Sequence, residues 1–173
     1  MKATKRRQLI IDYLSNANRP ISASYLAKHF SVSRQIIVGD IALLRAENHD
    51  ILSTHRGYLL SPTKNSHAFL GKVVCSHQSL DTEKEMLLIV NQGGSILDVQ
   101  VEHPIYGMLT AVLNIETRED VYHFIKEMKN SNATLLSSLT QGLHLHTISC
   151  ASKNQFEEIK KSLAAAHLLW NEE

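Results

Sequence analysis

Two histidines, His144 and His146, stand two residues apart in the segment TQGLHLHTISC. The segment is typical of a β-strand, in which side chains at i and i+2 lie on the same face. The alternation predicts that Leu143 and Leu145 face the core and that both imidazoles lie together on the opposite face. Two imidazoles about 7 Å apart along a strand can bind one metal ion. They can equally be two solvent-facing histidines.

A metal site needs further donors, and two earlier residues are suitable. His77 lies just after a predicted strand, and Glu85 lies one to two turns into the helix that follows it. If these elements fold over the last strand, three neutral imidazole nitrogens and one carboxylate converge. That donor set suits a divalent transition metal such as Zn, Ni, Co or Fe and leaves positions open for water or a ligand.

The chain has two cysteines, too few for a disulfide framework, and both lie near these histidines. Cys75 and Cys150 could act as metal ligands. A free cysteine in an apolar strand is more often a core residue, and we interpret both in that way. Two unpaired thiols also favour a reducing, cytosolic setting.

The segment VEHPIYG places His103 and Tyr106 on either side of a proline turn. Polar groups beside a planar ring could bind a small aromatic acid, by stacking and by donation to its carboxylate. The alternative is a rigid turn in which Tyr106 fills part of the core.

The elements that must position these residues follow from the periodicity of residues 69–173. Strands are predicted at 69–77, 95–103, 107–115 and 142–150, and helices at 81–94, 117–131 and 152–169. Thr117 is a suitable N-cap, as is Asp81 or Thr82. The order β-α-β-β-α-β-α predicts an α+β domain with a mixed sheet and helices packed on it.

The first sixty residues follow a different pattern. Apolar residues at helical spacing predict helices at 5–17, 22–30 and 34–48, and two short strands follow around Arg56-Gly57. Ser22 and Ser33 are suitable N-caps for the second and third helices. This order is that of a winged helix-turn-helix. We place the boundary between the two domains at residues 61 and 62, where a polar stretch with one proline begins.

A winged helix-turn-helix places its third helix in the major groove of DNA, with the first turn at the base edges. Ser33, Arg34 and Gln35 occupy that first turn, where arginine can pair with guanine and glutamine with adenine. Four basic residues are predicted to contact DNA phosphates: Lys5, Arg6, Arg45 and Arg56. Arg56 lies in the wing and could instead enter the minor groove. A three-helix protein-interaction module is the alternative interpretation.

The charge distribution favours DNA binding by the N-terminal domain. The first sixty residues hold nine basic and four acidic residues, a net +5, whereas the remainder holds nine and thirteen, a net −4. A chain of 173 residues that is 43% hydrophobic and 20% charged can form one or two soluble domains. It has neither an apolar run long enough to span a membrane nor a signal-peptide pattern, which predicts a cytoplasmic protein.

The motifs DVQVEHPIYG and LTQGLHLHT occur in this order after the helix-turn-helix segment VSRQIIVGDIALLRAENHDILSTHRGYLL. Together they resemble the three-histidine (3H) regulatory domain fused to a winged helix, as in the niacin-responsive repressors of the NiaR/YrxA type. The resemblance covers about residues 4–168. It implies a dimeric repressor of NAD-precursor uptake and salvage genes, with nicotinic acid as co-repressor.

The resemblance also implies a site. The metal ligands of the family fall on His77, Glu85, His144 and His146, the set that the strand argument proposes, with nickel or zinc as the ion. A nicotinate carboxylate or ring nitrogen could complete the coordination sphere. The residues expected to form the rest of the pocket are His103, Tyr106, Thr140 and Gly142.

Two other functions remain open from the residues. A regulator could sense the metal itself, in which case the ion must be released readily. A metal-dependent hydrolase could carry a DNA-binding domain, because a His3Glu site with open positions can activate water. No second acid–base residue is paired with the site in the sequence, which disfavours the hydrolase.

Overall fold

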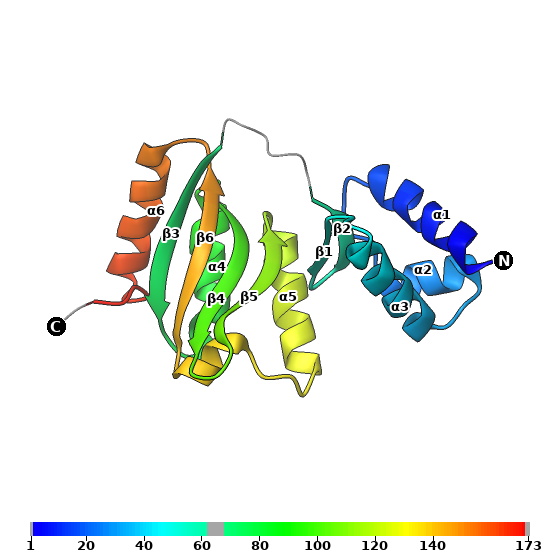
Figure 1. Ribbon diagram of the computed structural model, residues 1–173. Helices are drawn as coiled ribbons and strands as arrows, with labels where there is room; N and C mark the ends of the chain where they lie inside the picture. The colour runs from blue at the N-terminus through cyan, green and yellow to red at the C-terminus, as the bar shows by residue number, and fades with distance from the viewer. Residues whose placement is uncertain (1, 62–67, 172–173) are drawn as a thin grey trace. The chain divides into compact units, whose positions relative to one another are not determined.

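The computed structural model describes residues 2–61 and 68–171 (Figure 1). The chain divides into two compact units, residues 1–64 and 65–173. The predicted domain boundary at residue 62 lies outside the described residues. No helix within the described ranges is both long and apolar enough to cross a membrane.

The N-terminal unit is a winged helix-turn-helix, as predicted. Three helices, α1 (Ala3–Ser15), α2 (Ala23–Phe30) and α3 (Arg34–Ala46), precede a hairpin of β1 (Ile51–Thr54) and β2 (Gly57–Leu60). The hydroxyls of Ser22 and Ser33 accept hydrogen bonds from Tyr25 N and Ile36 N, so both predicted N-caps are confirmed. Ile10, Leu26, Ile37 and Ile41 meet in the core of the unit.

Arg6 does not face outward to meet a phosphate, and this prediction is wrong. Its side chain is only 10% exposed, and its Nε donates to Asp40 Oδ2 at 2.6 Å across two helices. Arg7 approaches the same carboxylate at 3.9 Å. Burial of the Asp40 charge requires a cationic partner, so Arg6 joins α1 to α3 and is not available to DNA.

The C-terminal unit has the predicted order of elements. Its strands are β3 (Phe69–Ser76), β4 (Ser95–His103), β5 (Gly107–Ile115) and β6 (Leu143–Cys150), and its α-helices are α4 (Thr82–Asn91), α5 (Arg118–Asn130) and α6 (Lys153–Ala165). Two 3-10 helices, η1 (Ser79–Asp81) and η2 (Leu136–Thr140), precede α4 and β6. Thr117 caps α5 in a capping box with Asp120.

The sheet is antiparallel throughout, and not mixed as the order of elements led us to expect. Its strand order is β3-β6-β4-β5. The helix between β3 and β4 makes these two strands parallel to each other, which would give a parallel pair if they were neighbours. The last strand, β6, inserts between them and pairs antiparallel with both.

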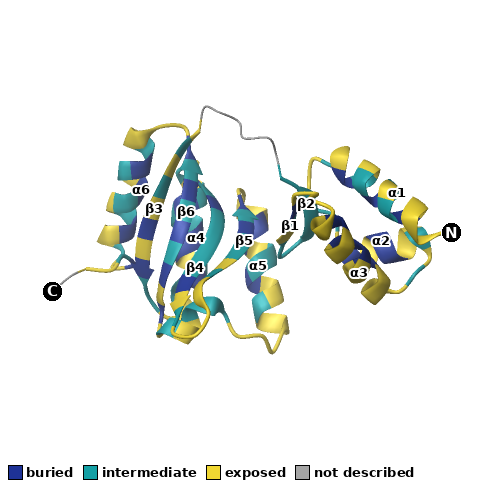
Figure 2. Ribbon diagram, in the orientation of Figure 1, coloured by how far each residue is buried: buried dark blue, intermediate teal, exposed yellow. Residues whose placement is uncertain are grey.

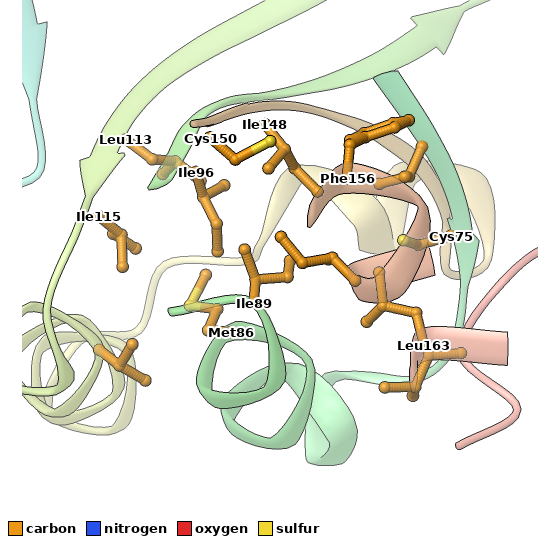
Figure 3. Close-up of a cluster of buried hydrophobic side chains, with 14 of the residues drawn as sticks. Cys75, Met86, Ile89, Ile96, Leu113, Ile115, Ile148, Cys150, Phe156 and Leu163 are labelled. Carbon is orange, nitrogen blue, oxygen red and sulfur yellow. The ribbon is translucent and has the colours of Figure 1, made fainter. Parts of the chain in front are cut away.

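The α-helices cover one face of this sheet. Strand residues Cys75, Ile96 and Ile148 pack against Met86 and Ile89 of α4, and α5 and α6 extend the same core (Figure 3). On β6 the burial alternates strictly, so that every second residue from His144 to Cys150 is buried (Figure 2). The core face of the sheet is therefore the face that carries the histidines.

Replacing Arg6 with alanine leaves Asp40 buried without its nearest cation. We expect the free energy of unfolding of the N-terminal unit to fall by about 1.5–3 kcal/mol, measured by urea denaturation with far-ultraviolet circular dichroism. Fluorescence of Trp170, the single tryptophan, reports on the other unit and stays unchanged. Lys5→Ala removes an exposed base next to Arg6, and an equal loss in that control would contradict the role of the buried pair.

Candidate metal centre

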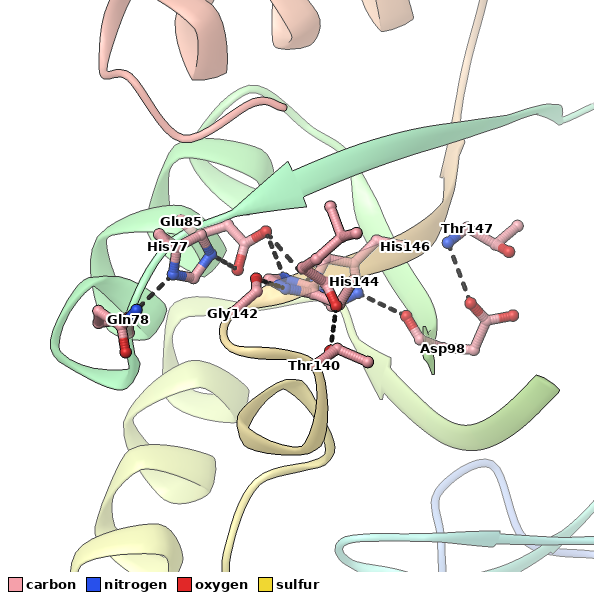
Figure 4. Close-up of polar contacts among 10 residues, drawn as sticks. His77, Gln78, Glu85, Asp98, Thr140, Gly142, His144, His146 and Thr147 are labelled. Carbon is pink, nitrogen blue, oxygen red and sulfur yellow. Dashed lines mark hydrogen bonds and ion pairs between the residues drawn. The ribbon is translucent and has the colours of Figure 1, made fainter. Parts of the chain in front are cut away.

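Three imidazoles surround one carboxylate inside the C-terminal unit (Figure 4). Glu85, on the first turns of α4, is 1% exposed. His77 Nε2 lies 2.8 Å from Glu85 Oε2, and the Nε2 atoms of His144 and His146 each lie 3.3 Å from Oε1. The end of β3, helix α4 and strand β6 therefore bring together all four residues that the sequence predicted as metal ligands.

Backbone carbonyls fix the tautomer of each imidazole. The Nδ1 atoms of His77, His144 and His146 contact the carbonyl oxygens of Gln78, Gly142 and Asp98 at 2.9, 2.8 and 2.6 Å. A carbonyl oxygen can only accept a hydrogen bond, so each Nδ1 carries the proton. In a neutral ring the Nε2 lone pair is then free, and all three lone pairs point toward Glu85.

This arrangement fits a divalent cation. His77 Nε2 is buried and, among the described residues, has no hydrogen-bond partner of acceptable geometry despite its short distance to Glu85. Metal-bound histidines commonly donate the other ring nitrogen to a carbonyl, as all three do here. An ion among the four groups would replace the unfavourable approach of lone pairs to a carboxylate with four favourable bonds.

The electrostatics of the cluster favour a charged carboxylate. Burial by itself raises the pKa of Glu85, but the facing imidazoles, His146 foremost, hold this pKa well below its ordinary value. Burial lowers the pKa values of His77 and His146, yet the Glu85 carboxylate outweighs burial and raises both. The site therefore attracts positive charge, whether from protons or from a metal ion.

The two histidines of β6 lie on the buried face of the sheet, which reverses the predicted orientation. His144 is 3% and His146 2% exposed, whereas Leu143 is 37% exposed. The prediction assumed that the apolar residues of an alternating strand face the core. Here a buried carboxylate from α4 compensates the polar side chains, and the leucines lie on the face without helices.

Cys75 lies in the hydrophobic core, as predicted, and it is also a neighbour of this cluster. It pairs with His144 across the two strands, and its Sγ, a Glu85 oxygen and a His144 nitrogen lie within 4.8 Å of one another. Burial, together with the nearby Glu85 carboxylate, raises the pKa of the thiol. The spacing Cys75-x-His77, which mirrors His144-x-His146, is the signal that could have identified it.

Gly142 and Thr140, predicted as ligand-binding residues, stabilise the strand that carries the histidines. The Gly142 carbonyl accepts hydrogen bonds from both His144 Nδ1 and His77 N. Gly142 has φ +99°, and a Cβ there would lie 2.3 Å from His77 O. The Thr140 hydroxyl donates to the carbonyl oxygen of Leu143. Neither residue lines the cavity that adjoins Glu85, His144 and His146.

His103 and Tyr106 lie at the turn between β4 and β5. His103 Nδ1 accepts hydrogen bonds from Ile105 N and Tyr106 N, which shapes the turn. Tyr106 is 74% exposed, so it is not a core residue. Among the described residues, no hydrogen bond or ring contact joins His103 or Tyr106 to the histidine cluster, and neither residue lines the cavity beside Glu85, His144 and His146.

A cavity of about 40 Å³ lies beside the cluster instead, where Glu85, His144 and His146 form one wall. Its other walls are mostly apolar and come from α4, β4, β5, α5 and the segment around η2. The residues that line it there are Thr82, Met86, Val99, Leu113, Phe124, Leu135, Leu136 and Ser137. The sequence pattern did not indicate this set, because its members lie on five separate segments.

In the N-terminal unit, Arg34 and Gln35 are exposed on the first turn of α3, as predicted. Arg45 supports the wing: its Nε donates to Ile51 O at 2.8 Å and its Nη2 to Ser53 Oγ at 2.6 Å. Arg56 lies at the turn between β1 and β2. Phosphate contacts by Lys5, Arg45 and Arg56 stay predictions.

The variant Gly142→Ala tests whether the backbone at this position fixes where His77 lies in the candidate metal site. The added methyl group would displace His77, and we expect the affinity for Ni²⁺ or Zn²⁺ to fall about 10–100-fold, measured by competition with a chelator. Gly107→Ala is the control, because Gly107 also has a positive φ, +70°, but has open space around it. Equal losses in the two variants would assign the effect to backbone strain and not to the position of His77.

Comparisons with known proteins agree with this architecture. Residues 6–59 match the model of an HTH domain, and residues 71–172 match that of the 3H domain. The chain is 39% identical to the transcription repressor NadR of Bacillus subtilis (strain 168) over 171 residues, 98% of this chain and 94% of that protein. It is 36% identical to the probable transcription repressor NiaR of Thermotoga maritima over 165 residues, 94% of this chain and 93% of that protein. The chain therefore belongs to the family of transcription repressors that join a DNA-binding HTH domain to a 3H domain.

Proposed function

We propose that this repressor controls NAD-precursor uptake and salvage genes and that nicotinic acid is its co-repressor. Nicotinic acid would bind at or beside a divalent metal ion, nickel or zinc, held by His77, Glu85, His144 and His146. The observation that carries the proposal is the convergence of three Nε2 lone pairs and one carboxylate next to an apolar cavity. The resemblance of its motifs to those of niacin-responsive repressors supports the choice of ligand.

The chemistry of nicotinic acid is suited to this site. Its pyridine ring would occupy the apolar part of the cavity, between the Val99 side and the Phe124 side. Its carboxylate or ring nitrogen would complete the coordination sphere of the ion. Nicotinamide has the same ring without the charge, so a carboxylate-reading site would discriminate strongly between the two.

Binding of the ligand would have to change the conformation around the cavity. About 40 Å³ is far less than the roughly 300–1,000 Å³ of pockets that hold small organic ligands. The segment of Leu135, Leu136 and Ser137 on one side is the wall that belongs to neither an α-helix nor a strand, and we assign the opening to it. A ligand that binds only the opened form can then shift the protein between two states.

The repressor would act as a homodimer formed through its C-terminal unit. In this mechanism the ligand-bound state fixes the distance between two N-terminal units. Their α3 helices then reach half-sites one or more turns of DNA apart. Nicotinic acid regulates only to the extent that it binds the DNA-competent state more tightly than the other.

The proposal predicts that nicotinic acid, but not nicotinamide, strengthens binding to DNA from upstream of niacin transport genes. Fluorescence anisotropy of the metal-loaded protein measures this.

The variant His144→Ala is expected to lose the nicotinate response and the metal while it keeps weak, salt-sensitive DNA binding. The variant His103→Ala, at the β4–β5 turn, is the control that keeps the response. Arg34→Ala is expected to lose operator binding and keep ligand binding. A normal nicotinate response by metal-free His144→Ala protein would contradict the role of the metal.

A second variant separates the ligand from the metal. Val99→Phe places a ring in the cavity, and we expect it to abolish the nicotinate response while the metal affinity stays within a few-fold of the original. Val112→Phe makes the same change on the open face of the neighbouring strand β5 and is expected to respond normally. Isothermal titration with nicotinic acid measures both. Unchanged nicotinate affinity in Val99→Phe would show that the ligand binds elsewhere.

A further inference from the structure

Six of the seven glycines of the chain are required by its fold. Four of them, Gly57, Gly93, Gly107 and Gly142, have φ between +70° and +137°, a conformation that other residues rarely adopt. A Cβ at Gly71 would lie 2.4 Å from the ring of Phe156, and one at Gly94 would lie 2.9 Å from Ile159 and Ile89. Only Gly39 has neither property.

Gly39 lies in the interior of α3, where glycine is unfavourable. Its φ is not positive, and a Cβ added there would meet nothing within 4 Å. Glycine in a helix interior destabilises the helix relative to alanine, because it loses more backbone entropy. The fold of the free protein thus gives no reason for glycine at this position, and a reason must come from something that approaches α3.

The position of Gly39 on the helix indicates what approaches it. At 100° per residue, the buried residues Ile37, Ile41 and Leu44 lie on one side of α3, and Gly39 lies almost directly opposite. The residues within about 40° of Gly39 around the helix are all exposed: Gln35, Leu43 and Ala46. One turn after Gly39 this face carries the exposed Leu43 side chain, so Gly39 is the point between Gln35 and Leu43 at which the backbone of the helix is uncovered.

We propose that Gly39 is the point at which the backbone of α3 comes into close contact with the floor of the DNA major groove. A methyl group would extend about 1.5 Å outward and hold the helix away from the base pairs. Arg34 and Gln35, one turn earlier, would then no longer reach the base edges in hydrogen-bonding geometry. Gly39 is thus a positioning residue for sequence recognition.

This inference uses the DNA-binding role of the HTH domain and does not depend on the metal or on nicotinic acid. Its test uses the full-length chain both without added ligand and with Ni²⁺ and nicotinic acid added equally to every variant. The probes are a duplex selected by the wild-type chain from a random-sequence library and a scrambled duplex of the same composition. Failure of the nicotinate titration would leave this test unaffected.

The variants Gly39→Ala and Gly39→Leu give two readouts that move in opposite directions. We expect Gly39→Ala to raise the melting temperature of the N-terminal unit by about 4–8 °C. We expect its affinity for the selected duplex to fall about tenfold, and that of Gly39→Leu about a hundredfold. Affinity for the scrambled duplex, which rests mainly on phosphate contacts, changes much less.

Ala164→Leu adds the same bulk to an exposed position of α6 and controls for a general effect of size. The raised melting temperature of Gly39→Ala shows that any loss of binding does not come from unfolding. Wild-type affinity of both Gly39 variants for the selected duplex would overturn the proposal. Failure of the wild-type chain to select any sequence under either condition would overturn it as well, because α3 would then read no bases.

Discussion

A single buried carboxylate determines how the C-terminal unit is built. Glu85 is almost completely removed from water, and a charge in that environment requires compensation from several directions. The compensation comes from three imidazoles, one just after β3 and two on β6, each oriented by a carbonyl. Because the groups belong to the end of β3, to α4 and to β6, the carboxylate ties the helix to the centre of the sheet. A cavity forms where this polar cluster meets the apolar core.

The basic residues of the N-terminal unit divide into two groups. Arg6 and Arg45 hold the unit together, one through the buried carboxylate of Asp40 and the other through the first strand of the wing. Arg34 and Gln35 remain exposed at the start of α3. A rigid connection from α1 to α3 and from α3 to the wing keeps the recognition helix and the wing in one body. Part of the positive charge thus orders the unit, and another part stays exposed to attract DNA.

Local signals were sufficient to predict most of the elements. Ser22, Ser33 and Thr117 cap their helices because a cap depends on neighbours within three residues. The histidine pair was recognised for a similar reason, since strand periodicity is local. The predicted face of the pair was wrong, because the orientation of both imidazoles toward the core depends on Glu85, which is 59 residues away from His144. Arg6 was misassigned in the same way, since Asp40 is 34 residues distant. The antiparallel sheet and the cavity also depend on contacts that no local pattern encodes.

The insertion of β6 between β3 and β4 has a consequence for the way in which the protein is made. The strand that carries His144 and His146 is made after the other three strands of the sheet, and it must enter the middle of a sheet whose other strands are already present. Until it does, β3 and β4 have no partner between them, and Glu85 has no imidazole from β6. Such long-range pairing is typical of slow folding. The complete cluster of imidazoles and carboxylate exists only once β6 has been made, so a chain truncated before β6 cannot assemble it.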